Sequence, residues 1–194
     1  QLYCERTNEY YLKDQWRGKW KSEGGSILIN QAIHFIDQML WISGGPSVEQ
    51  KPVAMIRNLG HEGVIETDDT SAAVVPLANG ALGIIEATCA SFHYWHNTLS
   101  FEGTEGIVEI RDDKPLSIEF KNPEVQKIVE CRLNEAAKPE GLGIGKEYYG
   151  GGHPAQINDF IAAIQEKRAP YVSIEDAAST ARVILEIYAP FRKV

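Results

Sequence analysis

The stretch from Gly24 to Pro46, GGSILINQAIHFIDQMLWISGGP, decides how this chain is interpreted. A glycine pair opens it, and Gly44-Gly45-Pro46 closes it with residues that favour positive φ angles and break helices. Between these ends the sequence is mostly apolar, with polar exceptions at Asn30, His34 and Asp37. At about 100° per residue, these three side chains fall on one stripe of a single helix. The pattern predicts one helix with a polar stripe.

The rest of that helix predicts burial. Asp37 is the only formally charged side chain between Glu23 and Glu49, whereas solvated helix faces are rich in Lys and Glu. We therefore expect the helix to be buried nearly all round. Burying the three polar side chains costs several kcal/mol unless each finds a partner. They form either a structural hydrogen-bonded cluster or the lining of a polar cavity, and the residues alone leave both open.

Length and charge limit the classes of function. The chain has 194 residues, enough for one large domain or two small ones with a substantial core. Acidic residues outnumber basic ones, 27 to 19, for a formal net charge of −8. An acidic chain without a block of Lys or Arg argues against binding to nucleic acid. Small neutral or cationic ligands fit better.

Cysteine usage and hydropathy point to a cytoplasmic protein. Cys4, Cys89 and Cys131 are odd in number and widely spaced, which favours reduced thiols over disulfides and supports no zinc site. We expect no signal peptide and no membrane segment, because every apolar run is too short or is interrupted by polar residues. The chain opens on Gln1 rather than Met, so we also expect a segment upstream of it.

The pattern after Pro46 is that of an α+β fold. Residues 1–23 show no clean period, and we expect them to be irregular. Two helices are predicted over 154–167 and 174–188, the second capped by Ser173, with a loop over 141–152. Tight-turn residues such as Asn79-Gly80 imply a large, mostly antiparallel open sheet with helices packed on one face. The predicted strands are 48–59, 70–77, 81–89, 98–102, 107–111, 116–120 and 126–133.

The strand over 81–89 predicts assembly. Its two alternating sets of side chains are both largely apolar, so both faces of the sheet should be covered. The predicted helices can cover one face, and few elements remain for the other. We therefore expect a homo-dimer or homo-tetramer formed through the sheet face.

These motifs together resemble the substrate domain of the glucose-fructose oxidoreductase, inositol dehydrogenase and MocA (Gfo/Idh/MocA) family. The resemblance spans essentially the whole chain. Its most specific part is the spacing from the glycine pair to His34 and Asp37. The other matching segments are Trp16-Arg17-Gly18-Lys19-Trp20, Asp69-Thr70, Asn79 to Gly83, Glu86-Ala87, Phe101 to Gly106, His153, Asp159-Phe160 and Ala162 to Ile164.

The resemblance implies a two-domain enzyme. Residues 1–194 would form a single C-terminal domain, similar to that of glyceraldehyde-3-phosphate dehydrogenase, for substrate binding and oligomerisation. An N-terminal Rossmann domain would hold NAD or NADP. This chain has no G-x-G-x-x-G after a strand, and Glu49-Gln50-Lys51-Pro52 only superficially resembles the family's catalytic Glu-Lys-Pro. By itself the chain should be inert.

The resemblance also assigns roles to residues. His34 matches the family's catalytic histidine, and an imidazole suits the transfer of a hydroxyl proton. Asn30 matches a group that hydrogen-bonds a substrate hydroxyl, although as a neutral amide it cannot act as a base. Asp37 could orient His34, or could instead bond a backbone amide or an arginine.

Further candidates for the substrate pocket flank this helix. Tyr11, Trp16 and Arg17 have the aromatic and guanidinium groups that sugar pockets use, although aromatic residues here could equally cap a core. His153 could reach the same cleft, or could be a surface residue at a helix start. His61, His93 and His96 fall in turn-like stretches, and the sequence assigns them no role.

The sequence thus predicts the substrate domain of an NAD(P)-dependent oxidoreductase. The substrate would be a secondary alcohol of a sugar, cyclitol or related polyol, or the corresponding ketone. Two alternatives share the fold: a non-enzymatic sensor and a structural dimerisation module. Retention of Asn30 and His34 favours the enzyme, because a sensor needs no group that transfers protons.

Overall fold

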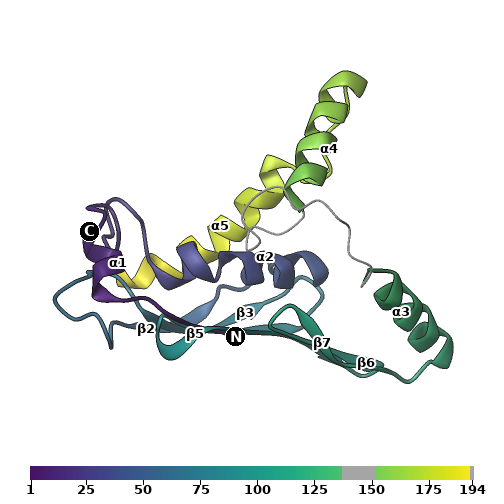
Figure 1. Cartoon of the computed structure of the whole chain (residues 1–194), viewed down its shortest axis with the longest axis horizontal. Coiled ribbons are helices and arrows are strands. Elements are labelled where there is room, and N and C mark those ends of the chain that lie inside the picture. Colours follow the sequence, from purple (N-terminus) through teal and green to yellow (C-terminus); the bar gives the residue numbers. More distant parts are fainter. Residues whose placement is uncertain (137–151, 193–194) are drawn as a thin grey trace.

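The computed structural model describes residues 1–136 and 152–192. One open sheet of seven strands forms the base, in the order β2-β3-β4-β1-β5-β6-β7 (Figure 1). The pair β1 and β4 is parallel, and the other neighbours are antiparallel. The strands are β1 Leu2–Glu5, β2 Val53–Arg57, β3 Thr70–Pro76, β4 Leu82–Thr88, β5 Ala90–Gly103, β6 Gly106–Arg111 and β7 Lys114–Phe120. The predicted α+β class is confirmed.

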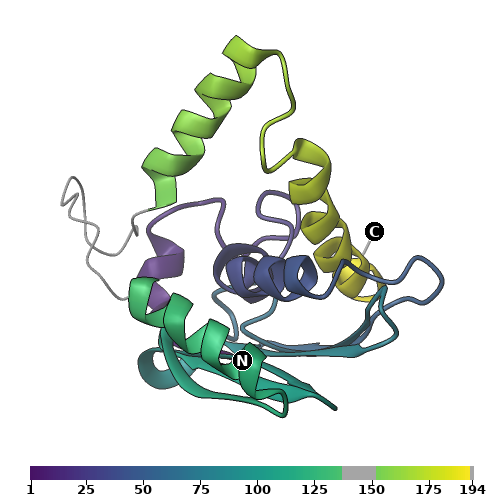
Figure 2. The ribbon, with the colours of Figure 1, turned by 90° about the vertical axis from the view of Figure 1, so that its right-hand side faces the viewer.

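Helices lie on one side of this sheet, as Figures 1 and 2 show. Two of them, α2 and α5, run next to each other over the sheet, and α4 projects away from it. The helices are α1 Asn8–Leu12, a π-helix Ile27–Gln31, α2 Ile33–Ile42, α3 Pro123–Ala136, α4 Gly152–Glu166, α5 Ile174–Tyr188 and a 3-10 turn Ala189–Phe191. Within the described ranges no helix is both long and apolar enough to cross a bilayer.

The core lies between the sheet and the helices α2 and α5. Ile36 and Leu40 of α2 and Ile184 and Ile187 of α5 are buried there, against strand residues such as Ile85. Burial of these side chains from water supplies the main driving force for folding, about 1.5–3 kcal/mol for each large aliphatic group. The core therefore fixes α2 on the sheet.

The structure changes the prediction for the glycine-bounded helix in two respects. A π-helical turn forms first, where the Ala32 amide donates to the Ile27 carbonyl at 2.9 Å, and α2 follows it. The helix is also not buried all round, since Trp41 is 73% exposed. Because only Ile36, Met39 and Leu40 of α2 are buried, the opposite face points away from the sheet. The predicted end is confirmed, with Gly44 at φ 81° and Gly45 at φ 98°.

The stretch that contains His93 and His96 is not turn-like, because both residues lie in β5, which begins at Ala90 rather than at residue 98.

Two further predictions of local structure are wrong. Residues 1–23 are not irregular throughout, because they contain β1, a central strand of only four residues, and α1. The predicted strand over 126–133 is part of α3. Asn122 begins this helix by accepting from the Glu124 amide at 2.9 Å, and Pro123 stands at the first helical position. The capping residues determine the helix here, whereas its short apolar run is ambiguous in period.

The last two predicted helices are confirmed. Helix α5 spans the predicted residues, and Ser173 and Asp176 form a reciprocal capping box at its start. Helix α4 begins at Gly152, and the rest of the predicted loop over 141–152 lies outside the described residues.

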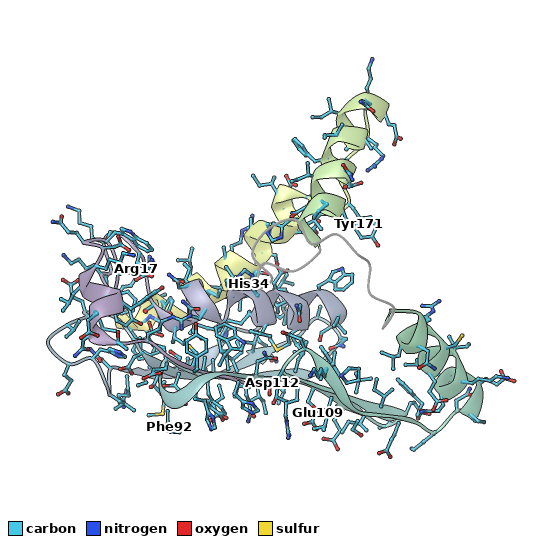
Figure 3. The ribbon with its side chains drawn as sticks, viewed as in Figure 1. Arg17, His34, Phe92, Glu109, Asp112 and Tyr171 are labelled. Atoms are coloured by element: carbon cyan, nitrogen blue, oxygen red, sulfur yellow. The ribbon has the colours of Figure 1, made fainter. Side chains whose placement is uncertain are left out.

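The outer face of the sheet carries exposed apolar side chains. In β4, Gly83 and the side chains of Ile85 and Ala87 lie on the core face, whereas Leu82 and Ile84 alternate with them and are exposed. Val53 and Met55 of β2 are exposed in the same way. Phe92, in β5, projects from the side of the sheet opposite the helices (Figure 3). Within this chain the described helices cover only the other face.

Candidate functional site

The glycine pair lets the chain pass close to an aromatic ring. A Cβ atom on Gly25 would lie 2.2 Å from Cε2 of Tyr188, so no larger residue fits without displacement. The Tyr188 hydroxyl accepts from the amide of Leu28 at 3.1 Å and from that of Ser26 at 3.3 Å. It donates to Asp68 Oδ2 at 3.0 Å. Two unpaired amides at the helix start are thereby satisfied.

The Asp68 carboxylate also binds the start of the π-helix. Its Oδ1 accepts from the Ser26 amide at 3.0 Å, and its Oδ2 also accepts from Ser71 Oγ at 2.6 Å. Burial raises the pKa of Asp68 to about 6, although these hydrogen bonds oppose the shift. Burial and the neighbouring Asp68 likewise raise the pKa of Tyr188. The start of the π-helix is therefore held by two buried polar side chains, those of Tyr188 and Asp68.

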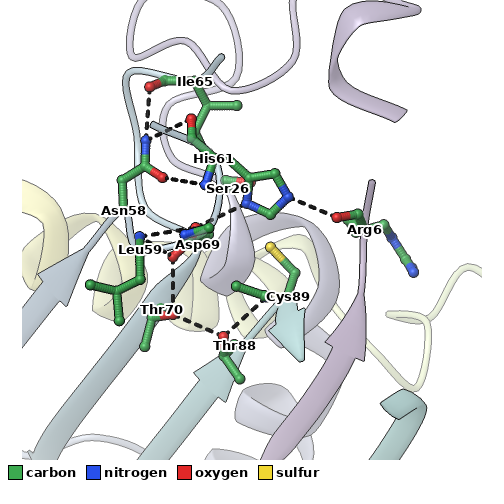
Figure 4. Close-up of polar contacts among 12 residues, drawn as sticks. Arg6, Ser26, Asn58, Leu59, His61, Ile65, Asp69, Thr70, Thr88 and Cys89 are labelled. Atoms are coloured by element: carbon green, nitrogen blue, oxygen red, sulfur yellow. Dashed lines mark hydrogen bonds and ion pairs between the residues drawn. The ribbon is translucent and has the colours of Figure 1, made fainter. Parts of the chain in front are cut away.

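The adjacent Asp69 binds the segment that follows β2 (Figure 4). It accepts from the amides of Leu59 at 2.9 Å and Gly60 at 2.7 Å. The His61 ring places Nδ1 2.9 Å from Asp69 Oδ2 and Nε2 2.7 Å from the Arg6 carbonyl oxygen. Each ring nitrogen of His61 therefore faces an oxygen that can accept a hydrogen bond. Burial alone would raise the pKa of Asp69, but the hydrogen bonds outweigh it and lower that pKa.

We call Ser26, His61, Asp68, Asp69 and Tyr188 the sealed cluster. All five side chains are buried, and each makes the hydrogen bonds described above. The sequence assigned His61 no role, and the structure gives it this structural one. The cluster fixes the backbone from which the functional candidates extend.

Asn30 lies in the π-helix, four residues after Ser26 of the sealed cluster, and is half-buried. Its Nδ2 donates to Glu23 Oε1 at 2.7 Å, and its Oδ1 accepts from Gln31 Nε2 at 2.9 Å. Gln31 Oε1 in turn accepts from Arg6 Nη2 at 2.8 Å. The half-buried amide of Asn30 is thus held from both sides.

His34 extends from the face of α2 opposite its buried residues, whereas Asp37 extends from the side of α2 that contacts α5. His34 is exposed, and Figure 3 places it on the helix-bearing side of the sheet. Asp37 Oδ1 accepts from Thr180 Oγ1 at 2.6 Å, which ties α2 to α5. This partner is a side-chain hydroxyl, which is neither the His34 ring nor the backbone amide or arginine that the sequence suggested for Asp37.

Arg17 and Trp16 form a stacked group beside Asn30. The Arg17 guanidinium lies 4.1 Å from the ring centre of Tyr10 and 4.4 Å from that of Trp16. It pairs with Asp14 at 2.8 Å and donates to the Tyr10 hydroxyl. Gln31 Nε2 also donates to this hydroxyl, at 3.3 Å, so the group is linked to Asn30.

Tyr11 and His153 lie apart from this arrangement. Tyr11 is only 4% exposed, and its hydroxyl contacts Ser26 Oγ at 2.9 Å and Cys89 Sγ at 3.0 Å. It therefore supports the sealed cluster from within the core. His153 is exposed in the first turn of α4. A hollow of about 640 Å³ lies further along this helix, bordered by residues that include Phe160 and Tyr171.

The structure thus brings Asn30, His34, Asp37, Trp16 and Arg17 onto the π-helix, α2 and the loop before them. Sequence reasoning missed Glu23 and Gln31, which hold the Asn30 amide. The position of Glu23, directly before the glycine pair, was a usable signal. The contact itself depends on the turn over 18–23, in which the Glu23 amide donates to the Lys19 carbonyl at 2.9 Å.

Several solved structures similar to this chain are named as dehydrogenases. The WlbA dehydrogenase of Bordetella pertussis, in complex with NADH and UDP-GlcNAcA, has 24% identity and a TM-score of 0.75, over 96% of this chain and 51% of that one. Its counterpart from Chromobacterium violaceum has 22% identity and a TM-score of 0.77, over 96% and 49%. A levoglucosan dehydrogenase with NADH and levoglucosan has 22% identity and a TM-score of 0.70, over 97% and 54%.

These likenesses establish the fold, and the chain spans about half the length of the proteins it matches. No curated protein matches the chain. A family model described as the C-terminal alpha/beta domain of an oxidoreductase family matches residues 3–193. With nearly its whole length covered, this chain belongs to the Gfo/Idh/MocA family of oxidoreductases, as its C-terminal domain.

Proposed function

We propose that this chain is the substrate domain of an NAD(P)-dependent oxidoreductase that acts on a secondary alcohol of a sugar, cyclitol or related polyol. The observation that carries the proposal is the exposed imidazole of His34, on a rigid helix, four residues after the fixed amide of Asn30. Family membership and the dehydrogenase neighbours support it. The sugar-like ligands named for those neighbours favour a hydroxylated substrate.

The chemistry requires a proton and a hydride to leave the same alcohol. His34 would accept the hydroxyl proton as the carbon–oxygen bond becomes a carbonyl, and would return it in the reverse direction. Asn30 would orient that hydroxyl or one next to it, and Arg17 and Trp16 would border the sugar. A bound nicotinamide supplies the acceptor for the hydride.

The cofactor would be held mainly by another part of the protein. The described residues contain no strand, glycine-rich turn and helix of the kind that binds a dinucleotide. Exposed apolar side chains on the helix-bearing side indicate that something covers it. Trp41 and Ile42 of α2 are exposed, as are Ile157, Phe160 and Ile164 of α4. A cofactor domain placed over His34 would cover such residues.

The outer face of the sheet would meet a second copy of the chain. Ile84 is 73% exposed, and the neighbouring apolar side chains of β2 and β4 extend this surface across the sheet. Burying such a surface between copies is favourable, and a sheet-to-sheet contact would protect it. Sedimentation of the intact protein as a monomer at micromolar concentration would contradict this part of the proposal.

The test uses the intact protein with NAD or NADP and a panel of sugars, cyclitols and polyols. His34→Ala should lower turnover by about 10²–10⁴-fold, the usual contribution of a positioned acid or base. Gln38→Ala is the matched control, because Gln38 is exposed one turn further along the same helix. Unchanged turnover in the His34 variant would rule out the assigned role.

A further inference from the structure

The carboxylate of Glu23 contacts the side-chain amide of Asn30, the group proposed to bind the substrate hydroxyl. Each of its oxygens has one donor: Oε1 accepts from Asn30 Nδ2 at 2.7 Å, and Oε2 accepts from the Gly18 amide at 2.5 Å. Hydrogen bonds to an ionised acceptor are shorter and stronger than those between neutral groups. Glu23 is half-buried, so water screens these bonds less than it would at an exposed site.

The opposite end of the Asn30 amide is held as firmly. Its oxygen accepts from Gln31 Nε2 at 2.9 Å, and Gln31 is itself fixed because its oxygen accepts from Arg6. Turning the amide over would place its oxygen against the Glu23 carboxylate and its nitrogen against the Gln31 nitrogen. Both contacts would be repulsive, so the network permits one orientation.

This orientation leaves a defined capacity for a ligand. An amide has two N–H donors and two acceptor sites, and the network uses one of each. Asn30 therefore retains one donor and one acceptor. A hydroxyl group can satisfy both, because it also donates and accepts. A carboxylate has no proton to donate at neutral pH, and the negative charge of Glu23 would repel a carboxylate and a phosphate alike.

We propose that Glu23 is a positioning residue of the substrate site, which fixes the Asn30 amide and so selects an uncharged hydroxyl group at that position. This inference rests on the proposed function, since it concerns how the same site recognises its alcohol. Glu23 acts through Asn30 and does not itself touch the substrate. Asn30 is neutral, and the Glu23 carboxylate places a negative charge next to its amide nitrogen.

The experiment compares four variants of the intact enzyme, assayed with the best alcohol from the polyol panel. Glu23→Gln should raise the KM for the alcohol about tenfold, through loss of a charge-assisted hydrogen bond, with little change in kcat or in the KM for the cofactor. Glu62→Gln, a charge change at an exposed position, is the control and should match the wild type. Asn30→Asp should lower the melting temperature, because it sets two carboxylates against each other.

The decisive variant exchanges the two groups, Glu23→Gln with Asn30→Asp. The new amide can accept from Gly18 and donate to the new carboxylate, which can still accept from Gln31, so the melting temperature should recover. The KM should stay high, because a carboxylate at position 30 has no donor for the hydroxyl. A purely structural role for Glu23 predicts instead that KM recovers together with stability.

The outcomes separate the two proposals. An unchanged KM in Glu23→Gln, or full recovery of KM in the exchanged variant, would overturn the role of Glu23 while the wild-type enzyme still turned over its alcohol. Absence of any turnover by the wild-type enzyme would overturn the proposed function and, with it, this inference. A raised KM that the exchange does not correct supports both.

Discussion

Asp68 and Glu23 are two of the carboxylates in this domain that accept from backbone amides, those of Ser26 and Gly18 respectively. Asp68, in the sealed cluster, is 1% exposed and has only protein partners, namely Ser26, Ser71 and Tyr188. Glu23 is half-buried and holds a side chain that keeps unused hydrogen-bonding capacity. The first arrangement uses its polar groups to fix the backbone, and the second leaves some for a ligand.

The difference indicates how stability and activity are divided. Changes in the sealed cluster should alter the stability of the domain, because buried polar groups without partners are costly. Changes on the open side should leave the fold intact and alter only what the site can bind or convert. Each variant below tests whether this division holds.

Gly25→Ala should have the largest effect on stability. The added Cβ would lie 2.2 Å from Cε2 and 2.5 Å from Cζ of Tyr188, a buried ring that cannot move aside freely. Overpacking of this kind costs about 3 kcal/mol, and here it also strains the hydroxyl that holds two amides. Urea unfolding of the domain would measure the loss.

Gly44→Ala is the matched control for that variant. Gly44 has a positive φ of 81°, and a Cβ there would meet nothing within 4 Å. Only backbone strain would remain, which costs about 1 kcal/mol. Equal losses of stability in the two variants would show that the close approach of Gly25 to Tyr188 is unimportant. The sealed cluster would then contribute no more to stability than an exposed turn.

The sequence predicts much of this fold because its local signals agree with one another. Ser173 begins α5 at the predicted residue, and Asn79-Gly80 connects two antiparallel strands as predicted. The error over 126–133 was avoidable, since Asn122 and Pro123 form a helix start. The central strand β1 was not, because four residues carry too little periodicity and only tertiary pairing reveals them.

The site was predictable in its residues but not in its contacts. The spacing of Asn30, His34 and Asp37 marked the segment, yet it implied one regular helix rather than a π-turn followed by α2. No local pattern shows that Glu23 returns to Asn30, because that contact requires the turn over 18–23 to fold. The sequence left open whether Tyr11 caps a core, and its burial depends on long-range contacts with Ser26 and Cys89.

Asp68→Asn should have an intermediate effect that depends on pH. Because burial raises the pKa of Asp68 to about 6, from 3.8, its contribution to stability is fully present below about pH 4 and is lost as pH rises through 6. The loss corresponds to about 3 kcal/mol. An amide does not titrate, so the variant should gain stability relative to the wild type between pH 4 and pH 6.

Thermal unfolding of both proteins across that range would measure the difference. The lowered pKa of Asp69 acts at the acidic end, because its contribution is present above about pH 4 and is lost below it. The interval from pH 4 to 6 therefore isolates Asp68. A constant difference between the two proteins across the interval would show that the Asp68 carboxyl is not destabilised by burial.

His34→Ala should have the smallest effect on stability. The imidazole is exposed on the face of α2 that points away from the core, and the helix is held by Ile36, Leu40 and the bond from Thr180 to Asp37. Removing an exposed side chain changes the free energy of unfolding by about 0.5 kcal/mol or less. The same change should abolish most of the turnover of the intact enzyme. A loss of 2 kcal/mol in urea unfolding would instead place His34 among the structural residues, and the division between a sealed side and an open side would fail at its most important position.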